Sequence, residues 1–415
     1  MYTPTTTTWR LDNGLIVLWN PRNEVNTVYL DARIPLGSAH IKNSAIPHAI
    51  EHLVEFSPTE AFPSREAIRT FATEYGIDSE AKTTRFSTEY TGSCLAEDYK
   101  HLLLFFKERL FCSRLSEKTF QKEAVRIKEE SNERISDPLR NFLDEFLVRQ
   151  TVSEPNILGR PIGTTQDIEG LTLDAARSVY HQYYTPTNTL LLISGPADLE
   201  AGIRTKIEEI FGAIPAPAKK SQTTNNTFSF RTGERKESFS KKSDGQYYFA
   251  FAFPLSSLPA TEEFKMRFVI EALYLQDSFL QDARDEFGLY HIEADYEWLP
   301  NSALLYIYGS TESFSTLTKL KEFINEKLLN KEVLTEERFI RAKQKQKYTL
   351  LTDFEFDTRT LDILGTNYLR TGEISSSEQL LSQIEDLKFL ETKAFVATMF
   401  GAKSMNSYIK GPKIQ

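Results

Sequence analysis

The sequence predicts an α+β protein made of two homologous domains, each with helices layered on a sheet in an α/β-sandwich-like arrangement. Three observations predict this fold class. Strand-like and helix-like segments alternate along the chain, a linker-like composition interrupts them near the middle, and two stretches about 220 residues apart resemble each other. The expected domains are residues 1–215, with the candidate site, and residues 245–415, a degenerate copy without it, joined by a linker region at 216–244.

The first elements follow from turn signals and from the spacing of apolar residues. Asp12-Asn13-Gly14, within residues 9–19, predicts a strand, a tight turn and a second strand. Val28 to Ile34 alternates apolar with polar or amphipathic residues, which predicts a half-buried strand. Pro47 suits the first turn of a helix that runs to about Phe56. Further helices are expected at 64–75, 97–110, 117–134, 139–150 and 173–184, and further strands at 86–93 and 189–194.

The second half resembles the first. Residues 248–255 match residues 29–36 in pattern, and residues 268–273 fall on residues 48–53. A period this long excludes a solenoid and favours a duplicated domain, with chance similarity of two strand-then-helix stretches as the alternative. In this alignment the second copy has lost the two histidines of the first.

Composition excludes several classes of partner. The chain has 49 Lys and Arg against 58 Asp and Glu, a net charge of −9, and no Lys/Arg-rich tract, which argues against nucleic acids and anionic membranes as partners. Cys94 and Cys112 are too few for a disulfide framework and fit a reducing compartment. The start resembles no signal peptide, and no segment approaches 18 apolar residues. We therefore expect a cytoplasmic protein without a membrane partner.

Two histidines carry the main chemical signal. His48 and His52 are four residues apart on the expected helix, so both imidazoles can reach one Zn²⁺. Glu51 lies beside the second histidine, better placed against a metal-activated water, as a general base, than as a ligand. The spacing H-x-x-E-H is the inverzincin signature. The alternative is a polar helix face with two solvated histidines.

A catalytic zinc needs a third protein ligand and an open position. Glu123 and Glu130 are seven residues apart in the helix expected at 117–134, so they point within about 20° of each other. Glu129 and Glu133 point elsewhere. Glu-rich helix faces are usually only solvated, so the spacing alone leaves the third ligand open.

These motifs resemble the insulinase and pitrilysin metallopeptidases (M16-like), in the shorter subfamily that includes the mitochondrial processing peptidase and bacterial zinc peptidases. The resemblance covers nearly the whole chain, through the histidine motif and through residues 11–17, 159–163, 183–188 and 193–195. It implies one Zn²⁺ per chain held by His48, His52 and Glu130, with Glu51 as base and Glu123 in the outer sphere. It also implies that the two domains form one half of a clamshell chamber, the other half usually coming from another subunit.

The family also has a signature in its second half, an arginine seven residues before a tyrosine that contacts the substrate carbonyl. Here the residue seven positions after Arg284 is His291, so in an alignment without gaps His291 takes the place of the tyrosine. If this chain has a one-residue deletion relative to the family, Tyr290 is the matching tyrosine. A structural arginine–glutamate surface pair is an equal alternative. Glu80 departs from the family's usual asparagine on the substrate-facing strand, and Pro47 replaces an alanine.

Together these features predict a zinc-dependent endopeptidase (a hydrolase) that cleaves peptides or unfolded segments enclosed in a chamber. The expected assembly is a homodimer or a heterodimer with a homologous subunit. The alternative is a non-catalytic or partner-dependent subunit that acts as a peptide-binding scaffold beside an active partner. A third possibility is a metal-free globular protein.

Overall fold

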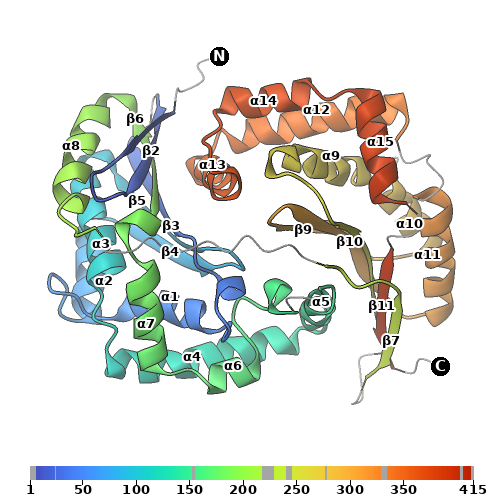
Figure 1. The fold of residues 1–415 in the computed structure, drawn as a ribbon, viewed down its shortest axis with the longest axis horizontal. Helices are drawn as coiled ribbons and strands as arrows, with labels where there is room; N and C mark the ends of the chain where they lie inside the picture. Colours follow the sequence, from blue (N-terminus) through green and yellow to red (C-terminus); the bar gives the residue numbers. More distant parts are fainter. Residues whose placement is uncertain are drawn as a thin grey trace. The chain divides into compact units, whose positions relative to one another are not determined.

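The chain forms two sheets, each within its own compact unit (Figure 1). The computed structural model describes residues 6–23, 25–151, 155–216, 229–239, 245–275, 278–328, 334–401 and 405–412. Both units combine a mainly antiparallel sheet with helices, so the two-domain α+β class expected from the sequence is confirmed.

The first unit is built on a six-stranded sheet with the order β1-β2-β6-β3-β5-β4. Its strands are β1 (Thr7–Arg10), β2 (Ile16–Arg22), β3 (Thr27–Ile34), β4 (Asp78–Thr83), β5 (Thr88–Leu95) and β6 (Leu190–Pro196). Only β2 and β6 run parallel. The predicted first hairpin is confirmed, and Gly14 adopts a φ of +93° in its turn, a conformation that favours glycine. Strand β4 forms one edge of the sheet, and among the strands that the structure describes it pairs with β5 alone.

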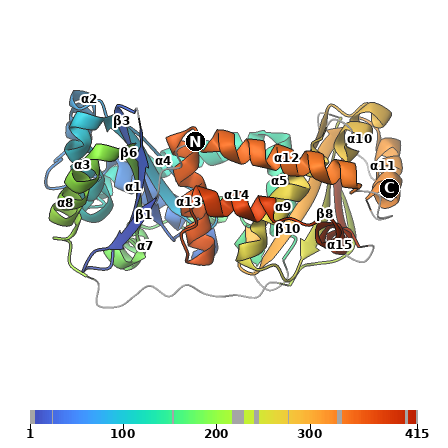
Figure 2. The ribbon, with the colours of Figure 1, turned by 90° about the horizontal axis from the view of Figure 1, so that it is seen from above.

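Helices cover both faces of this sheet. The helices of the first unit are α1 (Ile46–Phe56), α2 (Arg65–Glu74), α3 (Tyr99–Cys112), α4 (Glu117–Ser136), α6 (Thr165–Glu169), α7 (Leu173–Tyr183), α8 (Glu200–Phe211) and α13 (Asp357–Thr371). Figure 2 shows α1, α3 and α8 on one side of the sheet and α13 on the other. Apolar residues of β2, β3 and β6 form the core with α1, α3, α7 and α8. Helices α6, α8 and α13 and strand β4 are additions to the elements expected from the sequence.

The expectation that the strand at Val28–Ile34 is half-buried is wrong. Asp31 and Arg33, on its polar face, are each only 1% exposed. The face is buried because α13 packs on β3 and β6, and the two charged side chains pair with each other beneath it. A polar alternation therefore marks here a second buried interface instead of a solvated face.

The second unit has a five-stranded sheet with the order β7-β11-β8-β10-β9. Its strands are β7 (Glu234–Ser238), β8 (Tyr247–Leu255), β9 (His291–Leu299), β10 (Ser302–Thr311) and β11 (Asn406–Gly411). This order repeats β2-β6-β3-β5-β4 of the first sheet, and β7 and β11 form the parallel pair, as β2 and β6 do. The shared topology supports the duplication expected from the sequence.

The helices of the second unit are α5 (Pro138–Val148), α9 (Glu263–Leu273), α10 (Phe279–Phe287), α11 (Phe314–Lys327), α12 (Glu336–Asp353), α14 (Ser377–Glu385) and α15 (Phe389–Met399). Apolar residues of β8 and β10, among them Phe249, Phe251 and Phe253, build its core with α9, α10 and α11.

The units exchange one helix each. Helix α5 belongs to the first half of the sequence but packs on the second sheet, where Phe142 stacks on Tyr408 with ring centroids 5.2 Å apart. Helix α13, its counterpart in the second half, packs on the first sheet. Each sheet is therefore completed by a helix from the other half of the sequence.

The domain limits at residues 215 and 245 stay a prediction. Residues 217–228 and 240–244 of the expected linker lie outside the described residues, and β7 falls within the same region. Among the helices that the structure describes, none is long and apolar enough to cross a membrane.

Candidate metal centre

The start of helix α1 is fixed by a close backbone contact. Pro47 occupies the first turn, where a missing N–H breaks no helical hydrogen bond. Gly163 has a φ of +84° and lies against Ala45, the residue before the helix; an added Cβ would come within 2.6 Å of the Ala45 Cβ. The motif at 159–163 therefore sets where the histidine-bearing helix begins.

His48 and His52 lie on one face of α1, as the sequence predicts. Their ring centroids are 4.7 Å apart, and His48 is only 7% exposed. Between them along the helix, Ala49 packs with Ile127 of α4 in one small apolar cluster. A small residue at this position lets α4 approach, which brings its carboxylates to the histidines.

Glu130 of α4 completes a group that could hold a metal ion. Its Oε2 lies 3.5 Å from His48 Nε2 and 3.6 Å from His52 Nε2, and the three donor atoms all lie within 4.8 Å of one another. Ligand atoms about 2.1 Å from a tetrahedral zinc are about 3.4 Å apart, so the two distances from Glu130 fit zinc. The Glu130 side chain is 52% exposed, so the group opens to solvent, as a site that admits water requires.

Glu123 contacts the other nitrogen of His52. Its Oε2 lies 3.1 Å from His52 Nδ1, and its side chain is 2% exposed. A proton on Nδ1 shared with this carboxylate leaves Nε2 free to face Glu130. The helix spacing left open which glutamate is the third ligand; this geometry favours Glu130, with Glu123 behind His52.

Two arginines hold Glu123 in place. Arg126 Nη1 lies 2.9 Å from Glu123 Oε1, and Arg65 Nη1 lies 3.4 Å from the same oxygen. Both guanidinium groups also lie near the ring of Phe56, at 3.8 Å for Arg65 and 5.7 Å for Arg126. The charge of the buried carboxylate is thus balanced, and its position is defined on several sides.

Glu51 is buried beside this group, on the side of strand β4. It is 7% exposed and accepts a hydrogen bond from the hydroxyl of Thr83. Burial raises the pKa of Glu51 to about 7, although the Thr83 hydrogen bond acts in the opposite direction. A carboxylate with a pKa near neutrality can both accept and return a proton, the property of a general base.

The pKa values of the two histidine rings are shifted in opposite directions. Burial, and then the neighbouring His52, lower the pKa of His48 to about 4, so its imidazole is neutral near pH 7. Neutral imidazole is the form that binds metal. Burial also acts to lower the pKa of His52, but hydrogen bonds to Glu130 and Glu123 outweigh it and the pKa is raised.

The second-half residues lie in the second unit. Arg284, on α10, donates a hydrogen bond to the carbonyl of Ile292 at 2.8 Å. Tyr290 is 88% exposed, and its ring meets that of His291, the first residue of β9, with centroids 4.6 Å apart. The role of these three residues toward a substrate stays a prediction.

Other residues around the metal group could not all be found from the sequence. Glu80 is exposed on the edge strand β4, which also carries Thr83, the partner of Glu51. Arg126 is three residues after Glu123, a spacing that indicates a helical ion pair. Arg65 carries no such signal, because it reaches Glu123 from a different helix.

Comparisons with known proteins agree with this geometry. Residues 20–166 match the family model for insulinase (peptidase family M16), and residues 170–346 match the model for the peptidase M16 inactive domain. The chain is 27% identical over 227 residues to an uncharacterized zinc protease, YmfH, of Bacillus subtilis, covering 50% of this chain and 49% of that protein. It is also 27% identical over 198 residues to the zinc protease PqqE of Helicobacter pylori, covering 47% and 44%.

The matches thus span about half the length of these curated relatives. Among solved structures, a protease from Helicobacter pylori has the same fold, with a TM-score of 0.88 and 19% identity over 99% of this chain and 100% of that one. The two family models follow each other along the chain in the order of the two sequence halves. We conclude that the chain belongs to the insulinase-like peptidase family M16.

Proposed function

We propose that this chain is a zinc-dependent endopeptidase acting on peptides or unfolded segments. The observation that carries the proposal is the group of His48, His52 and Glu130, whose donor atoms all lie within 4.8 Å of one another, with Glu130 3.5 and 3.6 Å from the two imidazoles. Zinc bound there supplies a Lewis acid that polarises the scissile carbonyl and acidifies water. The names of the relatives, both zinc proteases, support the same metal.

The residues around the group are proposed to transfer the proton, orient His52 and contact the substrate. Glu51 accepts the proton of the attacking water and passes it to the leaving amine, which its raised pKa favours. Glu123 holds His52 by its Nδ1, which keeps the ring oriented while substrate binds. In the second unit, Arg284 with Tyr290 or His291 is proposed to contact the substrate carbonyl, as in the family signature.

The edge of the first sheet offers a place for the substrate backbone. Strand β4 ends the sheet and carries Thr83, which bonds to Glu51. An extended peptide can add to such an edge by main-chain hydrogen bonds, a mode that depends little on side chains. We therefore propose that the enzyme has broad specificity. We also propose that the two domains form half of a chamber, which a homologous subunit closes in a homodimer or a heterodimer.

A second candidate is a non-catalytic or partner-dependent subunit that binds peptides. It is favoured by one observation, that the family model matching residues 170–346 is described as an inactive domain. In this case the first unit keeps the fold, and cleavage needs another chain.

The test compares Glu51→Gln with the wild type in zinc content and in cleavage of a quenched-fluorescent peptide library, alone and with homologous subunits. We expect about one zinc per chain in both proteins and a loss of at least about 100-fold in kcat/KM in the variant. Glu60→Gln, an exposed position after α1, is the control and should keep full activity. Equal cleavage by Glu51→Gln would place the chemistry elsewhere, and zinc without cleavage in any mixture would favour the scaffold.

A further inference from the structure

A large pocket adjoins the metal group within the first unit. It lies between α2, along the whole length of that helix, and the first turns of α4, and its volume is about 1060 Å³. Phe56, Pro58 and Pro63 supply apolar lining, and Glu123, which holds His52, lies in its wall. The volume is slightly above the roughly 300–1,000 Å³ of ligand pockets, enough for a segment of a larger ligand.

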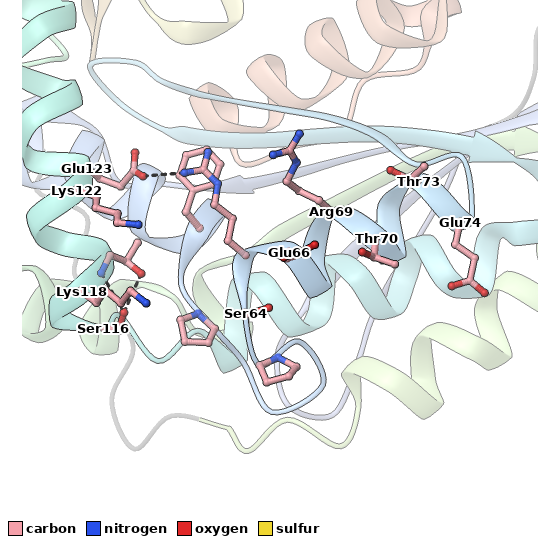
Figure 3. A pocket seen from close by; sticks show the side chains of 15 residues that line it. Ser64, Glu66, Arg69, Thr70, Thr73, Glu74, Ser116, Lys118, Lys122 and Glu123 are labelled. Atoms are coloured by element: carbon pink, nitrogen blue, oxygen red, sulfur yellow. Dashed lines mark hydrogen bonds and ion pairs between the residues drawn. The ribbon is translucent and has the colours of Figure 1, made fainter.

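Basic side chains gather in this pocket, which we call the basic pocket and define by Arg65, Arg69, Lys118 and Lys122. Figure 3 shows Lys118 and Lys122 on the α4 side and Arg69 on the α2 side. Arg65 is paired with Glu123. Within the described part of the chain, the structure records no ion pair or hydrogen bond for the other three, so their charges are available to a ligand.

The acidic residues of the lining do not cancel these charges. Glu123 is already shared by His52, Arg65 and Arg126. Glu74 contacts Tyr75, next to it at the end of α2. Only Glu66 stands opposite the three available cations without a recorded partner in the described chain. The pocket therefore has an excess of positive charge in a protein whose net charge is −9.

Within the basic pocket, Arg69 repels Arg65. Burial, followed by repulsion from Arg126, lowers the pKa of Arg65; Glu123 acts in the opposite direction, and repulsion from Arg69 is a smaller contribution. An anionic ligand would relieve this repulsion.

The spacing of the lysines fits an extended acidic peptide. Lys118 and Lys122 are four residues apart on α4, so their side chains start about 5–6 Å apart on one face. Alternate side chains of an extended peptide lie on one side, about 6.6 Å apart. Carboxylates at alternate positions of a bound segment can therefore each meet one lysine, while the apolar lining takes up the stems between them.

We propose that the basic pocket is a specificity subsite for acidic peptide segments, Asp or Glu at alternate positions, a few residues from the scissile bond. This proposal rests on the peptidase function proposed above. A peptide is favoured over a small free anion because the pocket is large, is partly apolar and shares Glu123 with the metal group. Exposed charge pairs each change affinity by roughly two- to five-fold, so two lysines together predict about a ten-fold preference.

The experiment uses pairs of fluorogenic peptides that differ only in Glu-x-Glu against Gln-x-Gln, placed on either side of the scissile bond. The measured quantity is the ratio of kcat/KM for the acidic and neutral peptides. We expect the ratio to be about ten in the wild type and to fall towards one in Lys118→Gln/Lys122→Gln. The control Lys42→Gln/Lys100→Gln removes the same charge from exposed positions of the same unit and should keep the ratio.

A binding measurement separates this proposal from the peptidase function. Fluorescence anisotropy of a labelled acidic peptide on Glu51→Gln requires no cleavage. Binding that depends on the two lysines, without any cleavage by the wild type, would support the pocket and reject the enzyme. A ratio near one in the wild type, or a ratio unchanged in Lys118→Gln/Lys122→Gln, would overturn the pocket proposal. So would displacement by inorganic phosphate without any preference for acidic over neutral peptide.

Discussion

Arg33 is the residue on which the first unit should depend most strongly for its stability. It lies in β3, is 1% exposed, and donates hydrogen bonds to Asp31 from Nε at 2.9 Å and from Nη2 at 2.7 Å. The same guanidinium donates to Asp362 and Thr366 of α13, each at 2.9 Å. One side chain thus ties a helix from the second half of the sequence to the first sheet. We predict that Arg33→Met destabilises this unit severely.

The size of the effect follows from the carboxylates that lose their partner. Asp31 is 1% exposed and has no other cation among its recorded contacts in the described chain, whereas Glu89 keeps Lys82 at 3.0 Å. Removing one member of a buried ion pair typically costs about 3–5 kcal/mol, because the other charge stays buried. This is a large part of the roughly 5–15 kcal/mol that stabilises a domain. Methionine keeps much of the volume, so the cost is mainly electrostatic.

The cost should depend on pH in a defined direction. Burial raises the pKa of Asp31 to about 6, although Arg33 opposes this. A carboxyl whose folded pKa is raised contributes stability below its unfolded pKa, and this contribution is lost as the pH rises through the folded pKa. Without Arg33 the pKa of Asp31 in the folded protein rises further. Above about pH 6 the free energy of unfolding of the variant should therefore fall relative to that of the wild type, by up to about 1.4 kcal/mol per pH unit. At pH 5 the acid is mostly protonated in both proteins, and the difference should shrink.

Urea unfolding followed by tryptophan fluorescence measures this, because two of the three tryptophans, Trp9 and Trp19, lie in the first unit. Arg10→Met, at an exposed position of the same sheet, is the control. The double variant Arg33→Met/Asp31→Leu, which removes both charges, should recover much of the loss. A loss below about 1 kcal/mol, or one that is the same at pH 5 and pH 8, would refute the reasoning.

Three further predictions concern the same unit. Glu130→Gln should reduce zinc affinity by at least about 100-fold, whereas Glu129→Gln, at an exposed neighbouring position, should keep about one zinc per chain. Elemental analysis after dialysis measures the zinc content of both variants, and equal zinc content would contradict the assignment of Glu130 as a ligand. Thr83→Val removes a hydrogen bond that lowers the pKa of Glu51, so the acid limb of the pH profile of kcat/KM should move to higher pH. If the acid limb does not move, the ionisation of Glu51 does not determine it. Gly365→Ala should lower the melting temperature although alanine favours helices, because its Cβ would lie 2.7 Å from Nε of the buried arginine; an unchanged or higher melting temperature would contradict this.

The parts of the site that lie on one helix could be predicted from the sequence. The spacing from His48 to His52, and from Glu123 to Glu130, follows helical geometry, which is local. The spacing does not predict which glutamate faces Nε2 of His52, because that depends on how α1 and α4 pack. Ala49 and Ile127 make that contact from segments 78 residues apart, and only the folded chain shows it.

The fold was harder to predict where the two halves exchange elements. The alternation of residues 28–34 is real, but it does not show that α13, more than 300 residues later, covers the polar face. The polar segment of β4, from Asp78 to Thr83, likewise carries no apolar alternation, because it is an edge strand whose side chains are all at least partly exposed. For residues 28–34 the missing information is a contact between distant segments, whereas β4 pairs with the nearby β5 and lacks a buried face because it lies at the edge of the sheet.

The helix of the second half that aligns with α1 carries apolar residues at the positions of the two histidines. At the positions aligned with His48 and His52, α9 has Phe268 and Ala272, and Phe268 is fully buried against Phe339 of α12, with ring centroids 5.5 Å apart. In the first unit, the counterpart helices α1 and α4 keep an apolar contact through Ala49 and Ile127, and imidazoles and carboxylates meet beside it. At the two aligned positions the helix pair is thus apolar and closed in one copy, and polar and open to solvent at Glu130 in the other. Polar groups at a position that the fold can fill with apolar side chains indicate selection for chemistry, because packing alone favours the arrangement of the second copy.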